Sequence, residues 1–338
     1  MKMTDLSSYS PLIFAMNIIK SLKIDPFLLT LITVVILATL FPCAGNVKVF
    51  FEYLTTFAIG LLFFMHGAKL SLQSIINGIR NWHLHLTIFI VTFAIFPLLG
   101  LGLQIFVPNF LSENLYLGFI YLCTLPATVQ SAIAFTSIAR GNVAAAVCSA
   151  SASTLLGVFI TPVLIAFIMH AQAGTGMSII DAITSIMLKL MLPFVVGHLS
   201  RRWIARWIDS HRKLINQTDR SSILLVVYVA FSDAVINGIW HQIDALSFTS
   251  IIIFSLLLLS LILLITTYGA RLLGFNKEDE ITIVFCGSKK SLASGIPMAS
   301  VIFPVSSMGL MVLPLMIFHQ IQLMVCAVLA SRYAKRKD

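Results

Sequence analysis

Residues 286–295 read CGSKKSLASG, and they place two adjacent lysines, Lys289 and Lys290, inside the apolar segment Ile281–Phe303. This segment is long enough to span a bilayer, for which about 20 apolar residues suffice. Lys289 is its ninth residue, so a rise of about 1.5 Å per residue places it roughly 12–13 Å deep, near the middle of the membrane. Each lysine at this depth costs roughly 2.5–3.5 kcal/mol. The two side chains should therefore face protein or water and not lipid.

Two interpretations explain the lysine pair. In the first, Lys289 and Lys290 contact an anionic substrate in an aqueous cavity. In the second, the pair has a structural role and is neutralised by an internal acid, such as Asp233, or by the carbonyl end of a half-helix. Both interpretations require a chain that folds within a membrane.

The composition indicates the same class of protein. Of 338 residues, 59% are apolar and 10% are charged, whereas a soluble domain has about 45–50% and about 25%. The net charge of +9 does not indicate a nucleic-acid partner, because basic residues of membrane proteins mark the cytoplasmic side. The cysteines and histidines lack the spacing of metal ligands. We therefore expect an all-α polytopic protein surrounded by membrane lipids, without a metal site.

The chain divides into ten apolar segments of spanning or near-spanning length. With the N-terminus in the cytoplasm, this division places 18 of the 22 basic residues on the cytoplasmic side, so both termini are expected there. The segments are Pro26–Phe41, Val49–His66, Leu84–Val107, Leu115–Ala139, Val143–Met169, Ile179–Leu199, Ile223–Ile239, Phe248–Leu273, Ile281–Phe303 and Gly309–Leu329.

An even split gives two halves of five segments. Because five is odd, the second half enters the membrane from the opposite face, which predicts an inverted repeat. We expect a cytoplasmic leader over residues 1–24, repeats over 25–170 and 171–332, and a basic tail over 333–338. The basic connection Arg201–Ser222 either lies along the anionic cytoplasmic leaflet or is a plain topogenic loop.

A weak internal match supports the repeat. At a constant offset of 160 positions the fourth segment can be laid over the ninth, which pairs Thr128 with Ser288, Gln130 with Lys290, and Ser131 with Ser291. Both segments also carry residues that interrupt helices, namely Pro126 in the fourth and Gly287, Gly295 and Pro297 in the ninth. Interrupted segments in matching positions of two halves point to a transport site.

Other polar residues inside the segments are weaker candidates. In the fifth segment Ser149 and Ser153 belong to a stripe of small residues, which favours close helix packing but also offers oxygens to a cation. Asp233 is an acid within the seventh segment, expected to pair with Lys189 or the lysine pair. The run Glu278–Glu280 is expected as a charged N-terminal cap. A polar streak of His319, Gln320 and Gln322 predicts bonding between helices.

The candidate substrate- and ion-binding residues share these mid-segment positions. They are Thr128, Gln130, Ser131, Ser149, Ser153, Asp233, Ser288, Lys289, Lys290 and Ser291.

Three stretches carry a resemblance to a known family. They are LPATVQSAIAFTSIARGNVAAAVCSASASTLLGVFITP at 125–162, ITIVFCGSKKSLASGIPMA at 281–299 and LPLMIFHQIQL at 313–323. With them the chain resembles the sodium/bile-acid symporter superfamily over roughly residues 25–334, and most of all its YfeH-like branch of bacterial transporters, which also includes the seventh member of human solute carrier family 10. The resemblance implies ten transmembrane helices in two inverted five-helix repeats. The fourth and ninth helices are broken and cross in a core domain, the first, second, sixth and seventh form a panel domain, and substrate binds between the two.

The resemblance also shows a departure. Sodium-coupled members carry an acid and an amide pair in the second crossing helix, where this chain has Phe285, Lys289 and Lys290. Gln130 and Ser131 lie nearest to the sodium-binding pair of the first crossing helix. Our hypothesis is that fixed lysine charge does part of the electrostatic work of sodium. Sodium stays open as a coupling ion, and no other cofactor is expected.

These features together predict a symporter for a small organic anion, working by alternating access in a bacterial inner membrane as a monomer or homodimer. A non-transporting regulator or channel-like protein is an alternative. An intramembrane hydrolase with a Ser-Lys dyad is a further alternative, but no GxSxG motif accompanies the serine and lysine residues. We therefore expect that the chain is not an enzyme.

Overall fold

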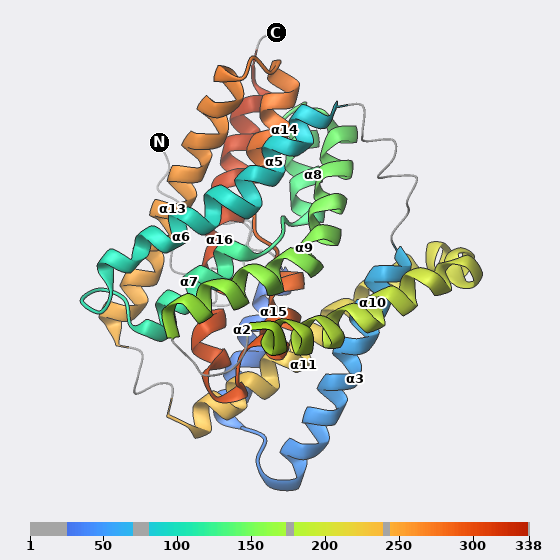
Figure 1. The fold of residues 1–338 in the computed structure, drawn as a ribbon, viewed down its shortest axis with the longest axis vertical. Helices are drawn as coiled ribbons and strands as arrows, with labels where there is room; N and C mark the ends of the chain where they lie inside the picture. The colour runs from blue at the N-terminus through green and yellow to red at the C-terminus, as the bar shows by residue number, and fades with distance from the viewer. Residues whose placement is uncertain (1–25, 70–80, 174–178, 239–243, 337–338) are drawn as a thin grey trace, which may run out of the picture.

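The computed structural model describes residues 26–69, 81–173, 179–238 and 244–336, and every element within them is a helix (Figure 1). The expected leader 1–24 and the end of the tail lie outside the described residues. The helices are α2 (Pro26–Leu40), α3 (Gly45–Lys69), α5 (Trp82–Ile90), η2 (Val91–Ile95), α6 (Phe96–Gly102), η3 (Leu103–Phe106), α7 (Glu113–Thr124), α8 (Val129–Ile138), α9 (Val143–Ala173), α10 (Ile179–Ser210), α11 (Arg212–Ile236), α13 (Ala245–Leu272), α14 (Lys277–Gly287), α15 (Leu292–Ile302) and α16 (Val305–Ala334).

Several helices are long and apolar enough to cross a membrane. Five meet this description within the described residues, and a sixth crossing results if the bent pair α7–α8 is one span. The five are Gly45–Lys69, Trp82–Phe106, Val143–Ile168, Ala245–Leu272 and Ser307–Ala334. The chain is therefore an all-helical integral membrane protein, while ten crossings stay a prediction.

Each of the ten expected segments coincides with a helix or an interrupted helix, with one difference in the middle of the chain. The expected connection Arg201–Ser222 is helical, because α10 continues to Ser210 and α11 begins at Arg212. Arginine, alanine and lysine are good helix formers, and the sequence from Arg201 to Ser222 contains neither glycine nor proline. The basic residues of this region therefore lie on two ordered helices.

Polar caps explain where several helices begin. Ser112 accepts a hydrogen bond from the backbone N–H of Leu115 at the start of α7, and Asp244 accepts one from Ser247 at the start of α13. Asn276 does the same for Asp279 at the start of α14. Such side chains satisfy N–H groups that have no partner inside the helix. The acids Glu278, Asp279 and Glu280 lie in the first turn of α14, as expected, and Asn276 supplies the hydrogen-bonded cap before them.

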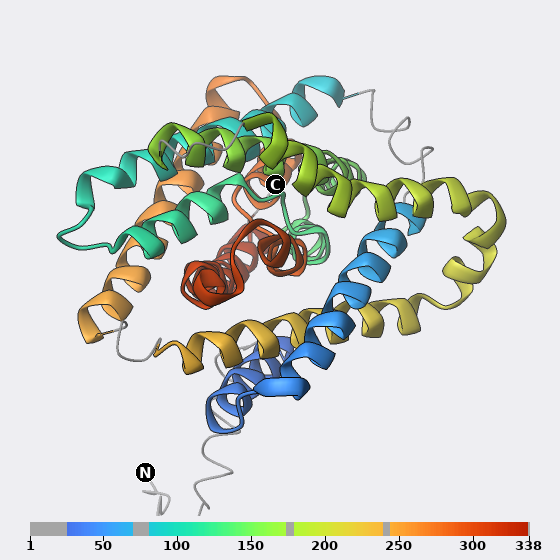
Figure 2. The same cartoon turned by 60° about the horizontal axis from the view of Figure 1, so that its bottom comes forward.

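The helices form two groups. α3 and α10 pack along each other at one side, and α11 contacts both α2 and α3. The C-terminal helices, red in Figure 2, lie between this group and α5, α6 and α9. Glycines permit the closest approach, because a Cβ atom at Gly67 would meet the Phe194 carbonyl oxygen at 1.9 Å and one at Gly197 would meet the Phe64 carbonyl oxygen at 1.9 Å. The two groups meet mainly where α11 contacts α15 and α16.

Two of the expected segments are broken, and the breaks touch each other. α7 and α8 are separated by four residues and bend by 62°. α14 and α15 are separated by Ser288–Ser291. The N–H of Ser291 donates to the Pro126 carbonyl at 2.9 Å, and the Thr128 hydroxyl donates to the Lys290 carbonyl at 2.8 Å. The two interrupted segments therefore meet at their breaks.

The helix boundaries correct the expected register and the expected breakers. Gly287 follows Thr124 by 163 positions, and Leu292 follows Val129 by the same 163. The offset of 160 was therefore wrong by three residues at the level of these boundaries. Gly287 ends α14, but Gly295 and Pro297 lie inside α15 and break nothing. A Cβ at Gly295 would meet side-chain atoms of Leu125 and Leu315 at 2.6 Å, so close packing accounts for this glycine.

Candidate functional site

The carbonyl groups at the end of α7 bind partners outside the ordinary helix pattern. Pro126 cannot donate an N–H group, and the last carbonyls of any helix lack partners within it. Each one left unsatisfied in this buried region would cost about 1–3 kcal/mol. The structure supplies a donor for each: Leu125 N–H for Leu122, the Lys290 ammonium for Cys123 and Leu125, the Thr161 hydroxyl for Thr124, and Ser291 N–H for Pro126.

The backbone at the second break is held by α16. The Gln322 amide accepts from the Lys290 N–H at 2.9 Å and donates to the Lys290 carbonyl at 2.9 Å. His319 Nδ1 lies 2.9 Å from the same amide. Gln322 and His319 of the expected polar streak therefore do contact another segment, at the interrupted backbone itself, whereas the amide of Gln320 has no hydrogen-bond partner among the described residues.

Lys290 points into the protein, where it is fully buried. Its ammonium donates to the carbonyl oxygens of Thr92, Cys123 and Leu125 at 2.8, 2.8 and 2.7 Å. The Phe96 ring centroid lies 4.2 Å from Nζ. This is the contact that the structural interpretation expects, with the carbonyl end of the half-helix α7 as the partner.

Lys289 is also fully buried but lies in different surroundings. Its Nζ has no hydrogen-bond partner among the described residues, and it lies 3.7 Å from the Phe135 ring centroid and 5.8 Å from that of Phe285. A cation over an aromatic face is stabilised by about 0.5–2 kcal/mol. Neither lysine lines the cavity described below. The direct anion contact of the first interpretation therefore stays a prediction, and it does not involve the cavity in this conformation.

Asp233 does not neutralise the lysine pair. Its carboxylate forms an ion pair with Lys48 of α3, and Lys48 also lies 3.8 Å from Glu52. Lys189, the other expected partner, is exposed on α10. The pairing with Lys189, Lys289 or Lys290 was therefore wrong, and the signal for Lys48 was only its place at the start of the second segment.

Three candidate serines are buried away from the cavity. Ser149 Oγ lies 2.6 Å from His85 Nδ1, and Ser153 Oγ accepts the Ala127 N–H at 3.0 Å. Ser288 is fully buried at the second break. The contacts of Ser149 and Ser153 join α9 to neighbouring segments, as the packing interpretation of the small-residue stripe predicts.

A cavity of about 720 Å³ lies between the two groups of helices. Four of the candidate residues line it: Thr128, Gln130, Ser131 and Ser291. They belong to the first turns of α8 and α15 or cap them. The hydroxyl of Ser131 is buried without a hydrogen-bond partner in the described part of the chain. The two helix breaks thus contribute one wall of this cavity.

The opposite wall carries residues that the sequence alone did not single out. Lys69, Arg201 and Arg220 line it, together with Asp219, which accepts a hydrogen bond from Lys69 at 2.5 Å. Arg201 donates to the Ala68 carbonyl at 2.6 Å. All of these residues lie near helix ends or within the expected connection. Their charge was therefore already explained by the preference of basic residues for the cytoplasmic side, and it did not mark them as site residues. Only their arrangement in space brings them to the cavity.

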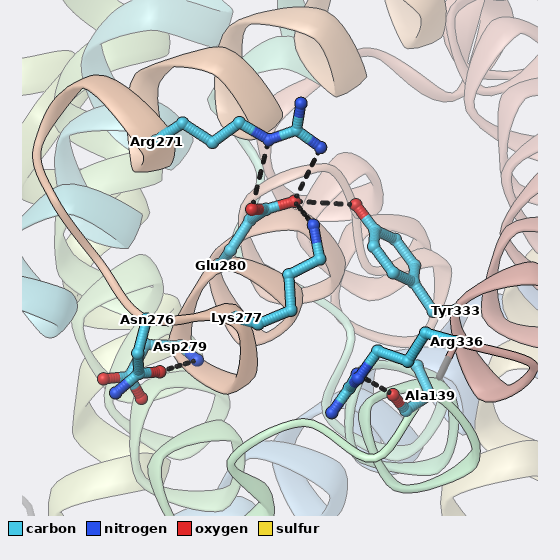
Figure 3. Close-up of polar contacts among 8 residues, drawn as sticks. All are labelled: Ala139, Arg271, Asn276, Lys277, Asp279, Glu280, Tyr333 and Arg336. Atoms are coloured by element: carbon cyan, nitrogen blue, oxygen red, sulfur yellow. Dashed lines mark hydrogen bonds and ion pairs between the residues drawn. The ribbon is translucent and has the colours of Figure 1, made fainter. Parts of the chain in front are cut away.

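A separate charged cluster ties α13, α14 and α16 together at one end of the bundle (Figure 3). Glu280 is 3% exposed and forms ion pairs with Arg271 at 3.2 Å and Lys277 at 2.6 Å, while the Tyr333 hydroxyl donates to it at 3.1 Å. Burial raises the pKa of Glu280, but the hydrogen bonds from Arg271 and Lys277 outweigh burial and hold this pKa below its ordinary value. Glu280 is thus more than the helix-end charge that the sequence predicted.

Comparison with known proteins covers nearly the whole chain. The model of the SBF-like CPA transporter family matches residues 25–335. The Escherichia coli protein named "Putative symporter YfeH" is 58% identical over 315 residues, which are 93% of this chain and 94% of the relative. Sodium/bile acid cotransporter 7 of Rattus norvegicus is 30% identical over 278 residues, 80% of each chain.

Proposed function

The chain belongs to the SBF-like CPA transporter family, and from this premise and the geometry of the cavity we propose that it is a secondary active transporter of a small organic anion. A membership among transporters argues against the hydrolase alternative. The observation that carries the proposal is the cavity in which two helix N-termini face three basic side chains.

The charges around the cavity favour an anion. The first turns of α8 and α15 present backbone N–H groups and the positive ends of helix dipoles, which attract negative charge. Lys69, Arg201 and Arg220 add three positive charges against the single acid Asp219 among the lining residues. The electrostatics of both walls therefore have the same sign.

The remaining lining favours an organic molecule over a bare inorganic ion. Apolar side chains cover much of the surface, and small-molecule sites typically combine such a lining with a few polar groups within about 300–1,000 Å³. The volume of about 720 Å³ falls within this range. The apolar residues are Phe27, Val129, Leu155, Phe194, Ile208, Ile215, Ile223, Leu292, Ala293 and Leu323.

Alternating access follows from where the cavity lies. One helix group (α2, α3, α10 and α11) would act as a panel, and the group that contains both breaks would act as a core that rocks against it. The offset of 163 at both boundaries of the two breaks supports the inverted repeats 25–170 and 171–332. Rocking of one group against the other exposes a site at their boundary to each side of the membrane in turn.

Sodium is one candidate for the coupling ion, because the rat relative is named as a sodium/bile acid cotransporter. The buried lysines favour a second possibility, in which fixed positive charge replaces part of a sodium site. Uptake with sodium replaced by a large organic cation separates the two. Unchanged uptake supports fixed charge, and strict sodium dependence refutes it.

The proposal is tested by uptake of labelled organic anions into proteoliposomes. A thermal-shift screen in detergent, with a bile acid among the probes, first selects an anion that binds. Gln130→Trp fills the cavity from an exposed position on its wall and should abolish uptake, whereas Ser137→Trp, on the exposed face of the same helix, should leave it unchanged. Equal uptake by both variants refutes the cavity as the substrate site.

The positive wall is tested in the same assay. Arg220→Gln removes a charge from the cavity, and Arg206→Gln removes one from the exposed surface of α10. We expect a raised KM only for Arg220→Gln. The rate of labelled-anion uptake is also compared between vesicles loaded with unlabelled anion and empty vesicles. Faster uptake into the loaded vesicles identifies a carrier, since a channel shows no such acceleration.

A further inference from the structure

The ammonium of Lys290 is held by three convergent backbone oxygens at a site that nothing above assigns to a ligand. The carbonyl oxygens of Thr92, Cys123 and Leu125 lie 2.7–2.8 Å from Nζ. They come from two segments that are distant in sequence, η2 and the end of α7. The side chain that fills this carbonyl cage is fully buried and has no carboxylate partner among the described residues.

Local backbone features explain why the oxygen of Thr92 is available. Within η2 the N–H of Phe96 donates to the Val91 carbonyl, five residues before it. The next residue that could bind Thr92 in this pattern is Pro97, which has no N–H group. A wide turn followed by proline therefore leaves the Thr92 carbonyl without a donor from its own helix.

The oxygen of Cys123 is available for a different reason. Its partner in an uninterrupted helix would be the N–H of Ala127, but this N–H donates to the Ser153 hydroxyl. Leu125 lies within the break itself. The negative end of the α7 dipole adds to the partial charges of these two carbonyls.

A set of convergent carbonyl oxygens is the donor set that proteins use to bind monovalent cations. We propose that Thr92, Cys123 and Leu125 form a site for a small monovalent cation, and that the tethered ammonium of Lys290 is its resident cation. The cage holds a dissolved cation once this ammonium is removed. Lys289 has no such cage, because its ammonium contacts aromatic rings instead.

The consequence for transport rests on the proposed function, although the site itself does not. A covalently attached cation neutralises the break of α7 and α8 throughout the cycle without being drawn from solution. This assigns the fixed charge to Lys290 alone. A dissociable coupling ion would have to bind elsewhere.

The test is chemical rescue, and it needs no substrate. Wild type, Lys290→Ala and Lys289→Ala are purified in choline chloride, whose cation is too large for the cage, and their apparent melting temperatures are measured as ammonium, methylammonium, sodium or potassium replaces choline at constant ionic strength. We expect saturable stabilisation of Lys290→Ala only, of roughly 5 °C when the cation reaches 100 times its Kd. Equal shifts in all three proteins, or none in Lys290→Ala, overturn the proposal.

A second variant and a second readout keep the test decisive. Lys290→Met fills the space with an apolar side chain, so it should lose stability and not be rescued. Rescue of Lys290→Met equal to that of Lys290→Ala contradicts a defined site. If Lys290→Ala does not stay folded in choline, the yield of monodisperse protein is compared with methylammonium present throughout. Recovery only with methylammonium supports the site, and failure in both solutions counts against it.

Discussion

Gln322 gives the sharpest test of how the second helix break is stabilised. Its amide binds both the N–H and the carbonyl of Lys290 at 2.9 Å, at a position where Gln322 and Lys290 are both fully buried. The Lys290 carbonyl keeps the Thr128 hydroxyl as a partner, but no other acceptor is within reach of the N–H among the contacts of the described residues. We therefore predict that Gln322→Leu leaves this N–H unsatisfied.

The size of the effect follows from these contacts. Loss of one neutral hydrogen bond costs about 0.5–1.5 kcal/mol, and an unsatisfied buried donor costs about 1–3 kcal/mol. Leucine keeps most of the side-chain volume of glutamine, so the substitution leaves little empty space and packing losses add little to the cost. The expected loss is about 2–4 kcal/mol, or a fall in apparent melting temperature of roughly 4–10 °C.

Gln320 provides a matched control two residues away. Both its amide atoms are buried without a partner in the described part of the chain. Gln320→Leu makes the same chemical change without removing a hydrogen bond, so we expect unchanged or raised stability. The assay is thermal unfolding of both variants in one detergent. A fall for Gln320→Leu as large as that for Gln322→Leu would refute the reasoning.

Three further predictions concern other contacts. Gly197→Ala should destabilise the protein by about 1–3 kcal/mol, because the added Cβ would meet the Phe64 carbonyl oxygen at 1.9 Å. Gly60→Ala is the control: a Cβ at Gly60 would meet open space, so this variant should be neutral or stabilising in the same unfolding assay. The pKa of Glu280 is lowered in the folded protein, so its ion pairs add stability above a pH of about 4.5, and this stability is lost as the pH falls through the pKa of the folded state. The melting temperatures of wild type and Glu280→Gln should therefore converge on acidification. A difference in melting temperature that does not change with pH contradicts this prediction. Asp233→Asn removes the ion-pair partner of Lys48 and should lower the melting temperature. Adding Lys48→Met should restore part of the lost melting temperature, because it removes the unpaired charge. If the double variant instead loses the sum of the two single-variant losses, the pairing is contradicted.

The sequence located the helix breaks because proline and paired mid-membrane lysines are local signals. It predicted that Lys289 and Lys290 avoid lipid, and both are buried in protein. It did not separate their roles, because their side chains diverge toward different helices. Only the positions of α7, η2 and α8 in space decide which lysine meets carbonyl groups and which meets aromatic rings.

The cavity was only half predictable. Thr128, Gln130, Ser131 and Ser291 follow from the breaks, which are visible in the sequence. The basic wall was not, because Arg201 and Arg220 lie in a stretch whose positive charge is already explained by membrane topology. Long helices such as α10 and α11 bring such residues to a cavity without leaving a distinct pattern in the sequence.

The most direct test measures which residues near the two helix breaks are accessible to water. In a variant without the five native cysteines, Gln130→Cys and Ser288→Cys are each exposed to a hydrophilic thiol reagent in native membranes and in detergent. Because Gln130 lines the cavity with an exposed side chain and Ser288 is fully buried, we predict rapid labelling of Gln130→Cys and labelling of Ser288→Cys only after unfolding. Rapid labelling at position 288 with protection at position 130 would contradict the account.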